Sequence, residues 1–352
     1  MLIPDAVRET ADAGGAPPPA PAAPALFGPR RLVRGWGRAT GSRSTVTRPA
    51  GDRAWRDQLA SAGPRGLIAR GGGCGYGDAA QNAGGIVAMT GAVAPATRFS
   101  VEDGTVVADA GVTLGALVRS LAPQGWTLPV LPGTARVTVG GAIAADVHGK
   151  NHVRYGTFGS QVREMSVLTP GLGPMTMGPR TNPDAFWATV GGLGLTGVIR
   201  QARLAVIPLD SWLMWCVDTV AEDLPSVMSE LRAAADGSAY AVAWIDGRRR
   251  GRQLGGGIIS RTEPVLPGHS APPDGGGDVR PRASTPTLPG AGIAWGPAAA
   301  AANSARLFLA RRRPRQVRPL PQALFPLDAV PGWPGLHGQR GLVQYQFVVP
   351  FG

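Results

Sequence analysis

The fold is decided by one glycine-dense stretch, Leu67-Ile68-Ala69-Arg70-Gly71-Gly72-Gly73-Cys74-Gly75-Tyr76-Gly77-Asp78. Its first three residues are typical of the end of a buried strand, and glycine then dominates the run up to Gly77. Such a segment can adopt positive φ angles and bring bare backbone N–H groups close to a ligand. A concave array of N–H groups binds anions such as diphosphate. In a chain with 52 glycines, a mobile loop is an equally good interpretation of this stretch taken alone.

A second glycine-rich stretch, residues 131–152, changes that balance. Small residues in it favour the start of a helix with Thr138 as the N-cap, and a polar cluster around His148 ends it. Two such loops beside apolar strand-like segments suggest one extended, phosphate-bearing cofactor held from two sides. The spacing argues against the two commonest nucleotide folds. No Gly-Lys-Ser/Thr follows either loop, and Tyr76 stands where a dinucleotide fingerprint has its last small residue.

The two loops resemble the FAD-binding loops of the vanillyl-alcohol oxidase and p-cresol methylhydroxylase (PCMH) flavoprotein superfamily. Within it the chain is most similar to the branch that oxidises polyprenylphosphoryl ribose during synthesis of a cell-wall arabinan precursor. The resemblance extends from about residue 31 onward. The other motifs that carry it are Gly35-Trp36-Gly37-Arg38, Pro129-Val130-Leu131-Pro132-Gly133-Thr134, His148-Gly149-Lys150-Asn151-His152, Phe186-Trp187-Ala188-Thr189-Val190-Gly191-Gly192, Gly194-Leu195-Thr196-Gly197, Pro326-Leu327-Asp328 and Gln344-Tyr345-Gln346-Phe347-Val348.

The resemblance implies an α+β fold in which two α+β subdomains hold FAD and an antiparallel-sheet substrate domain covers the flavin. We therefore expect a disordered Ala/Pro-rich N-terminus (residues 1–30), a PCMH-type FAD-binding domain (31–208) and a partial substrate domain (209–352). A Gly/Pro/Arg-rich disordered loop is expected at about 247–302. Residue patterns predict strands at 44–49, 67–70, 86–89, 97–101, 106–108, 162–169, 198–208, 212–220, 241–245 and 342–349, and helices at 51–62, 114–124, 183–190 and 224–235.

The resemblance also assigns the cofactor contacts. Relatives that bind their flavin covalently carry a histidine where this chain has Cys74. We therefore expect that FAD binds to this chain without a covalent bond. The residues expected to bind it are Ala69, Arg70, Gly71, Gly72, Gly73, Cys74, Gly75, Tyr76, Gly77, Asp78, Ala79, Gly133, Thr138, Val139, Gly140, Gly141, Ala145, Asp146, Val147, His148 and Ile199.

Three residues are candidates for catalysis: His148, Tyr76 and Gln346. Against this, a lone histidine often caps a helix, and Tyr76 could be a surface turn residue. Leu324 and Phe325 replace a tyrosine and a histidine of the family, and the relatives continue well past residue 352 with a lysine for which Lys150 cannot substitute. We therefore expect weak activity at best. The alternatives are a catalytically impaired FAD-binding remnant or incomplete reading frame, and an aldonolactone oxidase of the D-arabinono-1,4-lactone type.

The amino-acid composition limits which binding partners and which localisation we expect. The net charge is +12 and the pI about 11.2, yet all but one of the 35 basic residues are arginine, which GC-rich codons explain in part. Nucleic-acid binding is a third hypothesis, without a specific target. Arginines at 306–318 suggest either contact with anionic lipid or a solvated loop. Two cysteines without metal-ligand spacing, no signal peptide and no membrane span suggest a cytoplasmic, at most membrane-peripheral, enzyme. The expected substrate is a lipid-linked or small sugar, and the expected partner a short-chain reductase.

Overall fold

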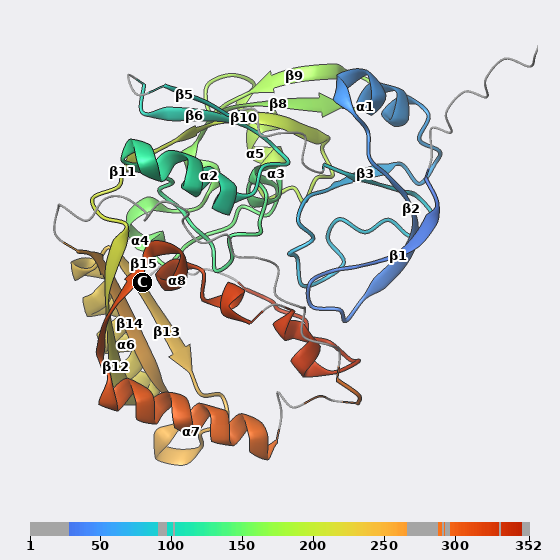
Figure 1. The fold of residues 1–352 in the computed structure, drawn as a ribbon. Coiled ribbons are helices and arrows are strands. Elements are labelled where there is room, and N and C mark those ends of the chain that lie inside the picture. Colours follow the sequence, from blue (N-terminus) through green and yellow to red (C-terminus); the bar gives the residue numbers. More distant parts are fainter. Residues whose placement is uncertain are drawn as a thin grey trace, which may run out of the picture.

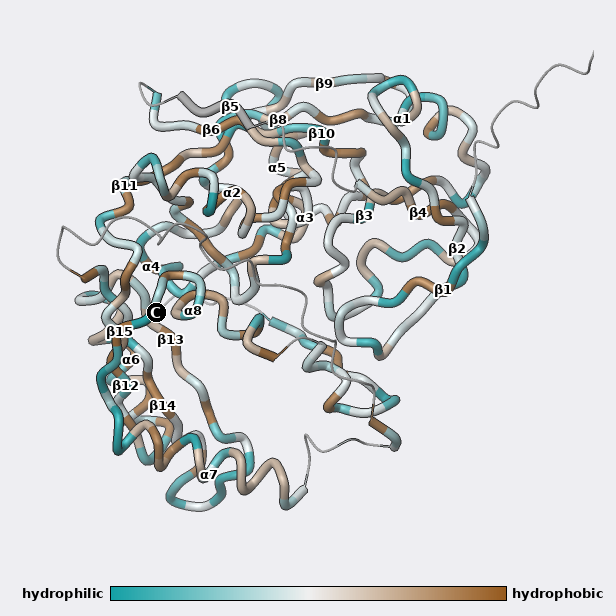
Figure 2. Tube along the Cα trace, viewed as in Figure 1, coloured by the Kyte–Doolittle hydropathy of each residue, from teal (hydrophilic) through white to brown (hydrophobic). Residues whose placement is uncertain are grey.

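The computed structural model describes residues 28–90, 97–100, 103–265, 288–290, 292, 296–330 and 332–346. The fold is α+β, with three main sheets that lie at the right, at the top and at the lower left of Figure 1. Apolar residues concentrate on strands inside the molecule and polar residues on its outer turns (Figure 2). Residues 1–27, most of the expected disordered N-terminus, lie outside the described part, whereas Arg30 already begins strand β1.

The first sheet has the order β1-β2-β4-β3, with the last two pairs parallel. Its helix α1 buries Trp55 against Ala88 and against Leu168 and Val198 of the second sheet. The Arg200 side chain lies over the Trp55 ring and forms an ion pair with Asp52 at 2.9 Å, which ties the two sheets together. The elements are β1 (Arg30–Arg34), β2 (Gly41–Thr47), α1 (Gly51–Ala60), β3 (Leu67–Arg70) and β4 (Ile86–Met89).

The second sheet is antiparallel, in the order β5-β6-β10-β8-β9, and carries the largest core. Helix α2 begins where the Thr113 side chain accepts a hydrogen bond from the Ala116 N–H, and it buries Leu114, Leu117 and Leu121. The elements of this part are β5 (Thr97–Ser100), β6 (Thr105–Asp109), α2 (Leu114–Leu121), β7 (Trp126–Thr127), α3 (Val139–Ala144), α4 (His152–Tyr155), β8 (Val162–Thr169), β9 (Gly173–Met177), α5 (Pro183–Thr189), β10 (Val198–Ala205) and β11 (Ile207–Pro208).

The third sheet is antiparallel, in the order β13-β14-β12-β15. Helix α6 packs on one face through Val227 and Ala234, and helix α7 packs on the other through Leu307 and Ala310. Helix α8 lies on the same face as α7, where Leu320 joins the main core. The elements are β12 (Leu213–Asp223), α6 (Leu224–Gly237), β13 (Tyr240–Ile245), β14 (Gly255–Pro264), α7 (Pro297–Arg312), β15 (Arg315–Pro319) and α8 (Leu320–Leu324).

Two predictions for this half were wrong. The range 247–302, expected to be loop or disorder, contains all of β14 and the first turns of α7. A solvated basic loop, one of the two interpretations of residues 306–318, is also wrong, because all of these residues except 313 and 314 belong to α7 and β15. Residues 266–287 lie outside the described part.

After α8 the chain returns toward the first two sheets through two short 3-10 helices, Pro326–Ala329 and Trp333–His337. The strand predicted for 342–349 is not formed by its described residues: Leu342 makes only an isolated bridge to Arg38, and 343–346 form no strand. The Asp328 carboxylate accepts hydrogen bonds from Thr134 Oγ1 at 2.5 Å and from the Ala135 N–H at 2.8 Å. Residues about 190 positions apart thus fix the second glycine-rich loop.

Candidate functional site

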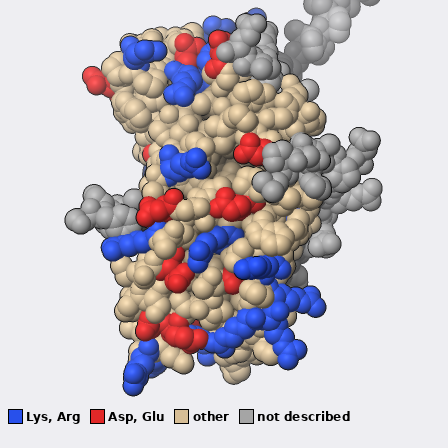
Figure 3. All heavy atoms as spheres, turned by 90° about the vertical axis from the view of Figure 1, so that its left-hand side faces the viewer, with Lys and Arg blue, Asp and Glu red and all other residues tan. Residues whose placement is uncertain are grey.

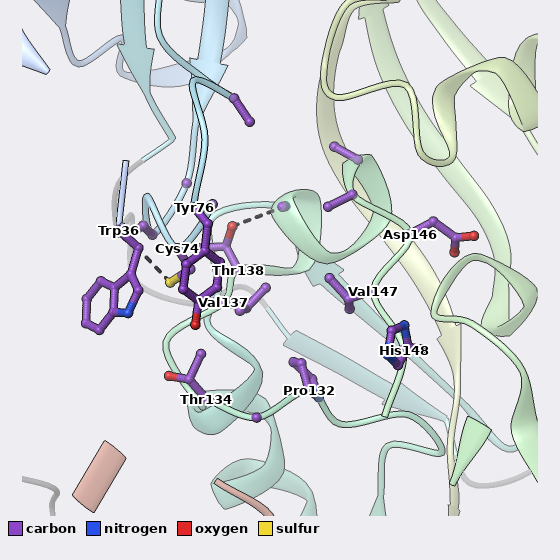
Figure 4. A pocket seen from close by; sticks show the side chains of 18 of the residues that line it. Trp36, Cys74, Tyr76, Pro132, Thr134, Val137, Thr138, Asp146, Val147 and His148 are labelled. Carbon is purple, nitrogen blue, oxygen red and sulfur yellow. Dashed lines mark hydrogen bonds between the residues drawn. The ribbon is translucent and has the colours of Figure 1, made fainter. Parts of the chain in front are cut away.

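A cavity of about 1360 Å³ lies where the three sheets face one another. Its wall is formed by both glycine-rich loops, by the edge strand β13 and by residues from the returning segment, among them Leu327 and Gln346. Figure 4 shows Tyr76 and Cys74 on one side of this space and Val147 and His148 on the other. The volume exceeds the usual range for drug-sized ligands, about 300–1,000 Å³, and fits a longer molecule such as a dinucleotide.

The first loop follows β3 directly and turns through Gly73, whose φ of +65° favours glycine. Behind the turn, the Arg70 guanidinium donates to the Arg34 carbonyl at 2.6 Å and to the Ala80 carbonyl at 3.1 Å. A Cβ at Gly73 would lie 2.3 Å from a terminal nitrogen of Arg70. A larger residue at this position would therefore combine a strained φ with a displaced Arg70 side chain.

The second loop contains helix α3, whose N-cap is Thr138 as the sequence predicted: its Oγ1 accepts from the Gly141 N–H at 3.2 Å. The two loops touch at this residue, because a Cβ on Gly71 would lie 2.1 Å from Thr138 Oγ1. Bare backbone from both loops thus meets at the cavity wall. This cradle fits a phosphate-bearing cofactor, since any larger residue at Gly71 would push the loops apart.

Most residues predicted to bind the cofactor line this cavity. Three do not: the Arg70 side chain is held behind the first loop, Asp78 is exposed, and Val139 is fully buried in the core. Those that do are Ala69, Gly71, Gly72, Gly73, Cys74, Gly75, Tyr76, Gly77, Ala79, Gly133, Thr138, Gly140, Gly141, Ala145, Asp146, Val147, His148 and Ile199.

His148 and Gln346 meet in the cavity, with the Gln346 amide Nε2 2.9 Å from His148 Nε2. An amide nitrogen only donates, so His148 Nε2 accepts and the ring proton sits on Nδ1. Burial and the neighbouring His152, whose ring lies edge-on at 5.5 Å, lower the pKa of His148, while Asp146 raises it. The imidazole is therefore neutral near pH 7 and can accept a proton.

The first loop carries two weakly acidic groups. Burial is the main cause that raises the pKa of Cys74 to about 11, and Arg136 opposes it, so the thiol stays protonated near neutral pH. Burial followed by the charge of Cys74 raises the pKa of Tyr76, whose ring lies 6.1 Å from that of Trp333. A neutral thiol is a poor nucleophile, which fits a cofactor that is not linked to Cys74.

Several cavity residues were missed from the sequence. Lys150 lines the wall and donates from Nζ to the Ala323 carbonyl at 2.6 Å. Residues 241–243 of β13 line it too, and so does Leu193, which has a positive φ of +52° in a third glycine-rich run. That third run and the single lysine were visible signals in the sequence. By contrast, Leu324 and Phe325, at positions expected near the substrate, are 1% and 3% exposed in the core.

The described residues contain neither a cluster of metal ligands nor a helix that could span a membrane. They contain no group of three or more His, Cys, Asp or Glu side chains that could hold a metal ion. Among the described helices, none combines the length and apolar character that a membrane span requires.

Comparison with known proteins gives the site a family context. Residues 57–175 match the family of FAD binding domains. Over 306 residues the chain is 36% identical to decaprenylphosphoryl-β-D-ribose oxidase of Mycolicibacterium smegmatis, which covers 83% of this chain and 65% of that protein. It is 35% identical over 181 residues to cytokinin dehydrogenase 1 of rice (47% of this chain, 32% of that protein). A candidate D-arabinono-1,4-lactone oxidase of Neurospora crassa is 30% identical over 112 residues (32% and 20%). The chain thus spans less than two thirds of each relative.

Proposed function

Because this chain belongs to the FAD-binding flavoprotein family, with FAD as its cofactor, we propose that it is an oxidoreductase of the sugar-oxidase type. In this proposal it oxidises a secondary alcohol, the C2 hydroxyl of a polyprenylphosphoryl ribose, in the synthesis of an arabinan precursor. The observation that supports it most is the His148–Gln346 pair in a cavity whose opposite wall is glycine-rich backbone.

The residues that hold the cofactor in this proposal are those of the two loops. Backbone N–H groups of residues 71–77 and 138–141 bind the diphosphate, and the small residues Ala144 and Ala145 leave room for the flavin ring. Bound FAD supplies the hydride acceptor at its N5 atom. Attachment is non-covalent, since the Cys74 thiol is neutral near pH 7.

The proton of the substrate hydroxyl is accepted by a residue of this chain. His148 accepts the hydroxyl proton at Nε2, the atom that receives the Gln346 amide in this structure, and its lowered pKa keeps it ready as a base. Gln346 in turn is within 3.3 Å of the Gln344 amide, which fixes its orientation. Tyr76 and Trp333 pack together beside the first loop and exclude water there.

Two partner assignments complete the proposal. A short-chain reductase returns hydride to the keto sugar released by this step. Peripheral contact with an anionic membrane brings the enzyme to a lipid-linked substrate, and it is supported by arginines that gather over the lower half of the face in Figure 3, where the third sheet lies.

The test is anaerobic loss of the oxidised-flavin absorbance after mixing the purified holoprotein with a prenylphosphoryl ribose. We expect reduction by this ester, and a rate at least about 100-fold lower for His148→Gln with unchanged flavin content. If only D-arabinono-1,4-lactone reduced the flavin, the result would contradict the proposal and support an aldonolactone oxidase instead. No reduction by either compound would indicate a catalytically impaired FAD-binding remnant.

A further inference from the structure

Helix α6 carries a row of apolar side chains on the side that faces the edge strand β13. Leu224, Met228 and Leu231 follow one another at spacings of four and three residues, so they share one side of the helix. Leu224 and Met228 are exposed, whereas Leu231 packs on Ala241 and Ala243 of β13 and lines the cavity with them. The row therefore starts at the cavity wall and continues onto the outer surface.

Two further exposed apolar residues extend this row. Leu254 directly precedes β14, and its carbonyl accepts a hydrogen bond from the Leu224 N–H at 2.9 Å. Ile245 ends β13, lines the cavity and pairs with Gly257. Two residues before Gly257 lies Gly255, on which Leu224 packs, because a Cβ on Gly255 would lie 2.6 Å from the Leu224 Cβ. The apolar ridge is formed by Leu224, Met228, Leu231, Ile245 and Leu254.

Strand β13 leads from the candidate catalytic residue to this ridge. The Ala241 N–H donates to the carbonyl of Lys150, two residues from His148, at 2.8 Å. From Ala241 to Ile245 the strand then covers about 13 Å, at about 3.3 Å per residue. The row on α6 runs beside it over about 10 Å, at about 1.5 Å per residue. In Figure 1, β13 is the strand of the third sheet that lies nearest the other two sheets.

Continuity with the cavity distinguishes the ridge from ordinary exposed leucines. Single exposed apolar side chains are common on protein surfaces and need no explanation, but a connected apolar surface marks a binding site. The α6 row is also free of charge, since its positions 224, 228, 231 and 235 are Leu, Met, Leu and Ala. A ligand that fills the cavity and continues over this surface needs a polar end and a hydrocarbon chain.

We propose that the apolar ridge binds the hydrocarbon chain of a lipid-linked substrate where that chain leaves the cavity over β13. The inference rests on the proposed function and adds to it a surface, outside the reacting centre, that sets a preference for chain length. Because the row on α6 is only about 10 Å long, the ridge contacts the isoprene units nearest the phosphate. The gain in affinity should therefore level off for longer chains.

The experiment is calorimetric titration of the holoprotein with dimethylallyl, geranyl and farnesyl phosphate, which lack the sugar and leave the flavin oxidised. Full burial of one CH2 group is worth about a fourfold gain in affinity, so we expect at least about a 10-fold gain from dimethylallyl to farnesyl phosphate on this half-exposed surface. Met228→Gln and Leu254→Gln should each weaken farnesyl phosphate binding about fourfold, the equivalent of one CH2 group, and leave dimethylallyl phosphate binding unchanged.

Val317→Gln is the matched control. Val317 is 48% exposed, as Met228 is, but it lies on β15 at the other edge of the same sheet and does not line the cavity. This variant should bind all three phosphates like wild type.

Equal affinity for the three phosphates would overturn the proposal, and so would a wild-type gain with chain length in both Met228→Gln and Leu254→Gln. A wild-type dimer that Met228→Gln dissociates, with unchanged affinity for farnesyl phosphate, would assign the ridge to a second copy of the chain and overturn the proposal as well. Flavin reduction by prenylphosphoryl riboses whose half-saturating concentration is independent of chain length would overturn the ridge alone. Binding that depends on chain length, without flavin reduction by any of these esters, would support the ridge and overturn the proposed function.

Discussion

We predict that Gly73 controls FAD binding through Arg70. Replacing it by valine puts a β-branched residue at a φ of +65° and a Cβ 2.3 Å from the Arg70 guanidinium. Arg70 is flexible enough to swing away, but it then gives up its bonds to the Arg34 and Ala80 carbonyls. The first loop loses both its turn and the side chain that holds it from behind.

The size of the effect follows from these two terms. A left-handed conformation costs a non-glycine residue about 1–2 kcal/mol. One lost hydrogen bond from a charged group costs about 1.5–3 kcal/mol. The flavin-free loop can rearrange to relieve the strain, so the cost falls mainly on flavin affinity. Together the terms predict at least about 100-fold weaker FAD binding for Gly73→Val.

The assay is fluorescence titration of the apoprotein with FAD, accompanied by thermal unfolding. Gly84→Ala is the matched control: its φ is +74°, its Cβ would meet no atom within 4 Å, and it does not line the cavity. That variant should lose about 1–2 kcal/mol of stability and keep its FAD affinity. Wild-type affinity in Gly73→Val would refute the assignment of this loop to the cofactor.

Three further outcomes are expected. Acid precipitation should release FAD to the supernatant from both wild type and Cys74→Ser; flavin retained in the wild-type pellet would contradict non-covalent binding. Burial, aided by Arg318 and Arg306, lowers the pKa of Lys150 to about 8 from its usual 10.5, so between these values the unfolded chain binds a proton that the folded chain does not. The free energy of unfolding should therefore rise between about pH 8 and 10.5 relative to Lys150→Met, and parallel urea-denaturation profiles would contradict this. Sedimentation with anionic vesicles should fall about 10-fold or more in the Arg313→Gln/Arg315→Gln double variant, and equal sedimentation with neutral vesicles would exclude membrane attraction.

The sequence predicted every strand of the first two sheets except β1 and β9, which were missed. The bounds of β3, β4 and β8 agree with the predictions, and so does the Thr138 cap. Strand β14 was missed because it opens with three glycines, which were interpreted as loop. The structure gives the reason for them: a Cβ on Gly257 would lie 2.0 Å from the Trp244 carbonyl. Close strand packing, not flexibility, requires glycine there.

The rest of the candidate site depends on tertiary contacts that no local pattern encodes. Residues 342–346 alternate like a strand, yet they find no partner strand and instead bring Gln346 to His148. Val242 reaches the cavity because β13 is an edge strand, and Arg306 and Arg318 separate from neighbouring arginines through helix phase and strand register. In the sequence analysis, these arginines were treated as a single basic segment.

The bonds from Asp328 to Thr134 and Ala135 impose an order on biosynthesis. At about 5–20 residues per second, a ribosome needs about 10–40 s to pass from the second glycine-rich loop to its carboxylate partner. During that interval the nascent chain holds a complete first loop and an unfastened second one. The second loop is therefore fixed only after residue 328 has been synthesised, later than every residue of the first loop.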